Sequence, residues 1–115
     1  MLEQNHQQVL FRWAKNYKGK NHECLQLLHS TGNGIHSTAK HITIAKMSGL
    51  LIGLPDIHLP VGKGLWIELK QHNGKVSRQQ KNIIELLNLY GNEAYICYGA
   101  GEAINIIIKY LEELS

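Results

Sequence analysis

The chain has 115 residues, of which 43% are hydrophobic and 18% are charged, so it can bury one core but has little room for a further module. Twelve basic and nine acidic side chains give a net charge of +3, which permits nucleic-acid binding without demonstrating it. The apolar stretch near residues 104–108 is too short to span a membrane and no signal peptide is apparent, so we expect one cytoplasmic domain over residues 1–115.

The first half of the chain predicts two helices separated by a strand and a turn. Apolar residues recur at helical spacing over residues 2–18, and an apolar run over residues 23–29 is typical of a strand. A glycine-rich turn at residues 32–34 follows. The next helix is expected over residues 38–47, with Ser37 as its cap.

The second half predicts a β-hairpin, a helix, a strand and a last helix. The hairpin strands are residues 56–59 and 65–70. Ser77 opens a helix that Gly91 ends, and residues 94–98 form a buried strand before an amphipathic C-terminal helix. The whole order is α-β-α-β-β-α-β-α, which predicts an α/β fold with a mixed β-sheet flanked by helices.

An acid and a lysine lie two residues apart on the second hairpin strand. Alternate side chains of a strand share a face, so Trp66, Glu68 and Lys70 are expected to point together. The carboxylate and the ammonium would then lie about 7 Å apart. The same spacing is common in weak, solvated ion pairs, so this strand alone does not define a site.

The hairpin brings a second carboxylate to this strand. If Pro60 pairs with Leu65, Asp56 reaches the level of Glu68 and Leu69. Two carboxylates and the Leu69 carbonyl would form an oxygen-rich site of the kind that Mg²⁺ or Mn²⁺ prefers. Such a cation polarises a phosphoryl oxygen and activates water, and a lysine can orient that water and neutralise charge. The combination points to phosphodiester cleavage.

These residues resemble the motifs of the PD-(D/E)XK nuclease superfamily, and the wider pattern is similar to its VRR-Nuc (virus-type replication-repair nuclease) branch. The core of the resemblance is a proline-aspartate followed by glutamate-x-lysine on the next strand. The matching segments are Glu3, Gln7, Arg12 and Trp13, then Asn33-Gly34, Gly53-Leu54-Pro55-Asp56, Ile67-Glu68-Leu69-Lys70, and Ser77 with Gln80. One departure is His29-Ser30-Thr31-Gly32 before Asn33, where the family often has a proline directly before the asparagine.

The resemblance implies a role for each matching residue of the site. Asp56 and Glu68 would bind the metal with Glu3 as a further acidic contributor, Lys70 would be the catalytic lysine, and Gln80 would be the active-site glutamine. It also implies a restriction-endonuclease-like fold and a homodimeric endonuclease that is selective for branched DNA such as four-way (Holliday) junctions. A viral or mobile-element source is suggested by the family name.

Several of these residues also have a structural interpretation. Glu3 lies in the first turn of a helix, where the macrodipole favours acids. Gln80 follows Ser77 by three residues, the spacing of a capping box, and this role can coexist with a role in the site. Trp13 continues the apolar stripe of its helix, so we interpret it as a core residue.

The sequence offers candidate residues for nucleic-acid contacts and one alternative function. Lys75, Arg78 and Lys81 gather at the start of one helix and, with Asn33, are candidates for phosphate contacts, although a solvated basic face is the default. The alternative function is an accessory protein that keeps the nuclease fold and binds nucleic acid without efficient catalysis. The intact acid-acid-lysine set argues against that alternative.

Two other motifs carry no chemistry in our interpretation. Cys24 and Cys97 lack the spacing of metal ligands, so we expect two buried, reduced thiols. Gly99-Ala100-Gly101 lies between a strand and a helix, where dinucleotide-binding folds place their phosphate loop. It lacks the third glycine and the later acidic residue, so it predicts a tight turn.

Overall fold

The computed structural model describes residues 2–32 and 39–115. Its helices are α1 (Glu3–Asn16), η1 (a 3₁₀ helix, His22–Leu27), α2 (Ala39–Met47), α3 (Arg78–Leu89) and α4 (Ala100–Glu113). Its strands are β1 (His29–Ser30), β2 (Ile57–Leu59), β3 (Leu65–Lys70) and β4 (Glu93–Tyr98). Asn33 and Ser37 lie outside the described residues.

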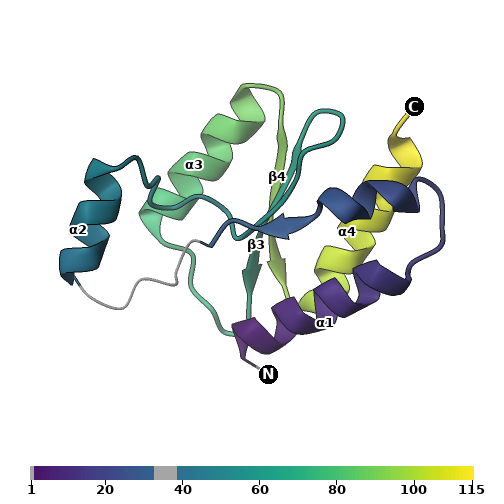
Figure 1. Ribbon diagram of the computed structural model, residues 1–115, viewed down its shortest axis with the longest axis horizontal. Helices are drawn as coiled ribbons and strands as arrows, with labels where there is room; N and C mark the ends of the chain where they lie inside the picture. Colours follow the sequence, from purple (N-terminus) through teal and green to yellow (C-terminus); the bar gives the residue numbers. More distant parts are fainter. Residues whose placement is uncertain (1, 33–38) are drawn as a thin grey trace.

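The four strands form one mixed sheet in the order β1-β2-β3-β4. β1, β2 and β3 pair antiparallel, and β3 pairs with β4 in parallel. Figure 1 shows α1 and α4 together on one side of the sheet, with α3 on the other side and α2 standing further out. The mixed α/β architecture and the order of its elements are those predicted.

One face of the sheet carries the hydrophobic core. On β3, Leu65, Ile67 and Leu69 are buried and belong to one cluster with Leu10 of α1 and Ile107 of α4. Because side chains alternate along a strand, Trp66, Glu68 and Lys70 lie on the opposite face, as the sequence predicted. The chain therefore separates its core from its polar side chains across a single strand.

The predicted strand over residues 23–29 is wrong. Residues 22–27 form the 3₁₀ helix η1, and β1 contains only His29 and Ser30. Leu25 and Leu28 are buried while Leu27 is more than half exposed. Buried side chains three residues apart match the repeat of a 3₁₀ helix, whereas a strand would bury alternate residues.

The hairpin is present with a register shifted by one residue. Leu59, rather than Pro60, pairs with Leu65, and Ile57 pairs with Ile67. The turn is closed by two hydrogen bonds between residues that are close in sequence. One runs from the Val61 N–H to the Leu59 carbonyl, and the other from the Gly64 N–H to the Val61 carbonyl. Gly64 has a φ of 95°, which a residue with a side chain rarely adopts.

The last strand lies at the edge of the sheet, so it is less buried than predicted. Ala94 and Cys97 are buried, but Tyr95 and Tyr98 are exposed. Both cysteines are free thiols, with Cys97 buried and Cys24 only half buried on η1. The turn at Gly99 leads directly into α4, as expected of a tight strand-to-helix connection. Within the described ranges, none of the helices is long and apolar enough to cross a membrane.

Tyr110 of α4 fastens the hairpin turn to the body of the protein. Its hydroxyl donates to the Val61 carbonyl and accepts from the Gly64 N–H at 3.0 Å. A single hydroxyl thus satisfies two backbone groups in a buried position. The turn that sets the β2–β3 register is therefore held in place by a residue that follows Gly64 by 46 positions.

Replacing Tyr110 by phenylalanine is expected to lower the free energy of unfolding by about 0.5–1.5 kcal/mol, because the Gly64 N–H and the Val61 carbonyl each lose one hydrogen bond and keep only the one between them. Urea unfolding followed by circular dichroism measures this loss. Tyr98→Phe is the matched control, since Tyr98 is exposed and should change stability little. Equal stability of the Tyr110→Phe variant and the unmodified protein would show that the hydrogen bonds of the Tyr110 hydroxyl contribute nothing to the free energy of unfolding.

Candidate active site

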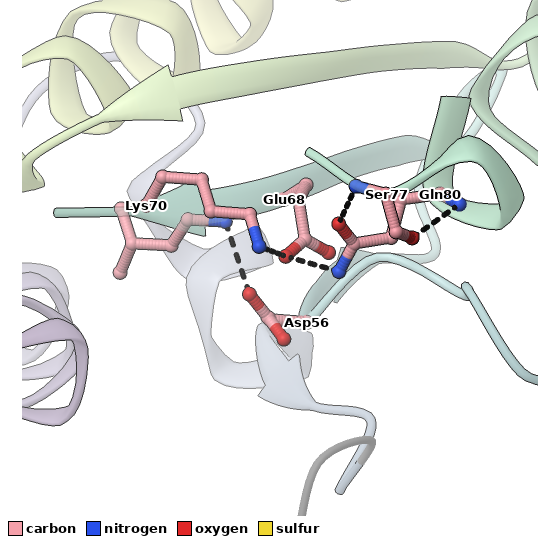
Figure 2. A network of polar contacts seen from close by, with 6 residues as sticks. Asp56, Glu68, Lys70, Ser77 and Gln80 are labelled. Atoms are coloured by element: carbon pink, nitrogen blue, oxygen red, sulfur yellow. Dashed lines mark hydrogen bonds and ion pairs between the residues drawn. The ribbon is translucent and has the colours of Figure 1, made fainter. Parts of the chain in front are cut away.

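Asp56 and Glu68 face each other across the hairpin. Asp56 directly precedes Ile57, whose partner is Ile67, so Asp56 lies level with Glu68. Its Oδ2 accepts a hydrogen bond from the Leu69 N–H at 3.1 Å. Figure 2 shows the two carboxyl groups on the same side of β3 together with Lys70 and Gln80. The predicted neighbours are therefore brought together despite the shift in register.

The segment before Asp56 packs closely on the first turn of α3. Gly53 has a φ of 91°, and a Cβ added there would lie 2.8 Å from the Gln79 carbonyl oxygen. Only glycine tolerates both the conformation and this approach. Thr31 adds a second anchor, because its N–H donates to the Asp56 carbonyl at 2.8 Å and its hydroxyl donates to the Pro55 carbonyl at 2.9 Å. The glycine-x-proline-aspartate segment is thus a shaped connection that fixes Asp56.

Glu68 is a buried carboxyl group with one satisfied and one unsatisfied oxygen. Only 2% of the residue is exposed. Its Oε2 accepts from Gln80 Nε2 at 3.0 Å and lies 3.3 Å from the Lys70 ammonium. Its Oε1 is buried and has no hydrogen-bond partner. A proton shared with Asp56, with which Glu68 makes a side-chain hydrogen bond, would satisfy this oxygen, and so would a cation bound between the two carboxylates.

This environment raises the pKa of Glu68 to about 8. Burial is the largest cause, because it disfavours the charged carboxylate. The negative charge of Asp56 raises the pKa further, and the nearby Lys70 ammonium opposes both effects. A second positive charge placed between the two carboxylates would therefore be strongly favoured.

The stability of the metal-free protein should accordingly decrease as pH rises from about 4.5 to about 8. Over this range folded Glu68 holds a proton that the unfolded chain releases, so raising the pH favours the unfolded state. Urea unfolding in chelator at several pH values tests this, with Glu68→Gln as the comparison. The variant should lose this part of the pH dependence and gain stability relative to the unmodified protein at pH 8; parallel pH profiles would contradict the assignment.

Gln80 combines the two roles that its position suggested. Ser77 caps α3 and forms a capping box, in which its hydroxyl accepts from the Gln80 N–H and Gln80 Oε1 accepts from the Ser77 N–H. With its oxygen held in this way, the amide of Gln80 must present its NH₂ group to Glu68. The same capping motif that starts the helix therefore orients an active-site side chain.

Lys70 lies at the end of β3 in a restricted space. The residue is 8% exposed, and a Cβ added at Gly74 would lie 3.2 Å from the Lys70 Cβ and Cδ. Its carbonyl accepts from the Gly99 N–H at 2.8 Å, which links β3 to the start of α4. The backbone of Lys70 is thus fixed by the start of α4, and the turn at Gly74 lies close to the base of its side chain, whose ammonium is paired with Glu68.

A histidine that sequence reasoning missed completes this junction. His6 Nδ1 accepts a hydrogen bond from the Ala100 N–H at 3.1 Å. It caps the N-terminus of α4, for which Gly99 offers no side chain. No sequence signal announces this contact, because its two residues are 94 positions apart.

The remaining predicted residues are placed only in part. Glu3 begins α1, but its side chain lies outside the described part of the structure, as does all of Asn33. Lys75, Arg78 and Lys81 are exposed around the start of α3. Trp13 is partly buried and packs against the hydrophobic core, as predicted.

The arrangement fits a hard divalent cation. The oxygens that could bind it are those of the Asp56 carboxylate, Glu68 Oε1 and the Leu69 carbonyl, which points to the same strand edge as the Leu69 N–H. Among the described side chains, no group of three or more His, Cys, Asp or Glu residues could hold a metal. Two carboxylates agree with Mg²⁺, which keeps several waters and commonly binds through one or two carboxylates.

The comparison with known proteins agrees with this geometry. Residues 1–101 match the family described as the VRR-NUC domain. The chain belongs to the VRR-NUC family. A solved structure described as "VRR_NUC domain protein" is 27% identical in sequence and superimposes with a TM-score of 0.81, covering 97% of this chain and 89% of that one. No protein with a curated description matches the chain.

Membership of the VRR-NUC family gives the chain a nuclease-type, and therefore hydrolytic, function. The structural neighbour also agrees with the restriction-endonuclease-like α/β fold that the motifs implied. The segment from Gly53 to Gln80, which holds the last three of the matching motifs, contains all the described side chains of the site.

Proposed function

We propose that this VRR-NUC protein is a Mg²⁺- or Mn²⁺-dependent endonuclease that hydrolyses phosphodiester bonds in DNA, with a preference for branched DNA such as four-way junctions. The observation that carries the proposal is the pairing of half-buried Asp56 with buried Glu68, whose Oε2 lies 3.3 Å from the Lys70 ammonium and whose Oε1 has no hydrogen-bond partner among the described residues. The preference for branched DNA is carried over from the family resemblance and is the finer part of the proposal.

Each side chain of the site has a distinct task in this mechanism. Asp56, Glu68 and the Leu69 carbonyl would hold the cation, with Glu3 as a further candidate ligand. When bound, the cation polarises the phosphoryl oxygens and makes water a better nucleophile. Lys70 places a fixed positive charge where negative charge develops on the phosphate. Gln80 keeps Glu68 oriented throughout.

The alternative of an inactive accessory protein finds less support in the structure. Binding of nucleic acid alone does not require a buried glutamate such as Glu68, which has a raised pKa and one oxygen without a hydrogen-bond partner among the described residues. Strongly perturbed titratable groups gather at sites of catalysis. The retained arrangement of Asp56, Glu68 and Lys70 therefore favours the catalytic function.

The deciding experiment is cleavage of end-labelled single-stranded, duplex, flapped and four-way-junction DNA of matched sequence. Each substrate is incubated with Mg²⁺, with Mn²⁺ or with chelator. Internal cuts that require a divalent cation would support the endonuclease, and faster cutting of the junction than of the linear duplex would support the preference for branched DNA. DNA binding without cleavage in any metal would support the accessory protein instead.

We further propose that the protein acts as a homodimer on DNA. Two sites related by a two-fold axis could cut two symmetric strands of a junction. The exposed part of the last helix and the edge of the hairpin are candidates for the interface. The exposed apolar side chains at the end of α3 are another candidate, namely Leu86, Leu89 and Tyr90. Sedimentation equilibrium of the purified protein gives the mass that decides between monomer and dimer.

A further inference from the structure

Three aromatic rings stand in a row across the first three strands of the sheet. Strand pairing places His29 opposite His58, and His58 opposite Trp66. The rings of His58 and Trp66 are stacked, with centroids 3.5 Å apart and planes 12° apart. His29 meets His58 nearly at right angles, with a centroid distance of 5.3 Å. We call these three residues the aromatic row.

The aromatic row lies on the same face of the sheet as the active site. Trp66 is two residues from Glu68 on β3, and His58 is two residues from Asp56. Alternate residues of a strand share a face and lie about 7 Å apart, so the row begins one step from the carboxylate pair. The main hydrophobic cluster lies on the other side of the sheet, with α1 and α4.

The row remains accessible at the open end of this face. α3 packs against β4, whereas the row occupies β1, β2 and β3. His29 is exposed, and His58 and Trp66 are half buried. Trp66 is held in place because its Nε1–H donates to Asn92 Oδ1 at 3.1 Å. His29 is held by its Nδ1, which donates to the Leu27 carbonyl at 2.9 Å.

We propose that the aromatic row binds an unpaired nucleobase next to the phosphodiester that the site cleaves. Fixed aromatic rings bind single-stranded nucleic acid by stacking, because every base has an aromatic face. A base must leave the double helix to be bound in this way, and branched DNA supplies such bases where strands separate. This inference rests on the proposed nuclease function and names the part of the substrate that the site would recognise.

A purely structural role for these rings makes a different prediction. Cross-strand aromatic pairs stabilise a sheet by about 0.2–1 kcal/mol each. β1 contains only two residues, so ring contacts could serve mainly to keep it attached. In that case the loss of a ring would lower stability, while the affinity of the folded protein for DNA would stay the same.

The test uses the fluorescence of Trp66 in chelator, where DNA binding can be followed without cleavage. The protein has two tryptophans, so Trp13→Phe leaves Trp66 as the only one. Single-stranded and flapped oligonucleotides should quench Trp66 fluorescence, and blunt duplex of the same sequence should quench it much less. His58→Ala should weaken binding of the single strand by about 5-fold to 100-fold, the range for one lost stacking contact.

Matched variants separate recognition from folding. His58→Phe keeps an aromatic ring and should restore most of the affinity, whereas a loss that reflects only altered folding would track the melting temperature. His22→Ala changes a half-buried histidine of η1 and should leave DNA binding unchanged. With saturating metal, His29→Ala and His58→Ala should raise KM for flapped DNA more than they lower kcat.

The outcomes also distinguish this inference from the proposed function. Unchanged Trp66 fluorescence with every DNA, or unchanged KM in both histidine variants of an active enzyme, would overturn the role of the aromatic row. Absence of cleavage by the unmodified protein would overturn the nuclease proposal, while the fluorescence titration would still report whether the row binds DNA.

Discussion

Lys70→Ala is expected to reduce the rate of DNA cleavage at saturating metal by about 10²-fold to 10³-fold, the usual effect of removing one preorganised group that stabilises developing charge. The Lys70 ammonium lies 3.3 Å from Glu68 Oε2 and is largely shielded from solvent. Solvent therefore weakens its electrostatic effect only a little. The fold should persist, because the alanine leaves the backbone hydrogen bond from the Gly99 N–H intact. Single-turnover cleavage of a labelled substrate measures the effect.

A second consequence of losing Lys70 must be separated from the first. The ammonium lowers the pKa of Glu68, so its removal should raise that pKa further and weaken metal binding near neutral pH. Cleavage is therefore measured over a metal titration and at a pH above 8. Recovery of full activity at high metal concentration would assign Lys70 to metal binding alone. Lys63→Ala, an exposed lysine of the hairpin turn, serves as the control and should cleave normally.

Asp56→Asn is expected to abolish the thermal stabilisation that Mg²⁺ or Mn²⁺ gives to the protein. A ligand present at a hundred times its Kd stabilises the folded state by about 2.7 kcal/mol. For a domain of about 100 residues, this corresponds to a rise in Tm on the order of 10 °C. The variant keeps an acceptor for the Leu69 N–H but loses the charge that holds the cation. Thermal unfolding with and without metal gives the comparison.

The same variant should behave in the opposite way when metal is absent. The charge of Asp56 raises the pKa of Glu68, so its removal relieves repulsion inside a buried site. In chelator, at a pH near 8, Asp56→Asn should therefore be at least as stable as the unmodified protein. Glu85→Gln on the exposed side of α3 should retain the full metal shift. A metal shift that survives in Asp56→Asn would remove this residue from the binding site.

The local parts of the site were predictable from sequence because their physics is local. Alternation along β3 placed Glu68 and Lys70 on one face, and the spacing of Ser77 and Gln80 predicted the capping box. The prediction that Asp56 lies near Glu68 required only a short hairpin. It therefore held although the predicted strand register differed by one residue from the observed one. Each of these relations spans 13 residues or fewer.

The relations that failed or went unseen depend on distant packing. The segment now known as η1 has an apolar run that suits a strand equally well, and only the burial of Leu25 and Leu28 against the core selects the helix. His29 joins the aromatic row because β1 pairs with β2, a pairing across nearly thirty residues that no pattern announces. The hydrogen bond between Tyr110 and Gly64 joins residues 46 positions apart, and the His6 cap joins residues 94 positions apart.

The contact between His6 and Ala100 has a consequence for the order of folding. The hairpin that carries Asp56 and Glu68 closes a loop of a few residues, which costs little chain entropy and is fast. The helix that begins with Glu3 supplies the His6 side chain that caps α4, and this contact joins residues 94 positions apart, so it can form only when α4 has formed beside it. We therefore expect the two-carboxylate pair to assemble early and the N-terminal helix to dock late. A newly made chain would pass through a stage in which its hairpin is formed while its active site is still open on one side.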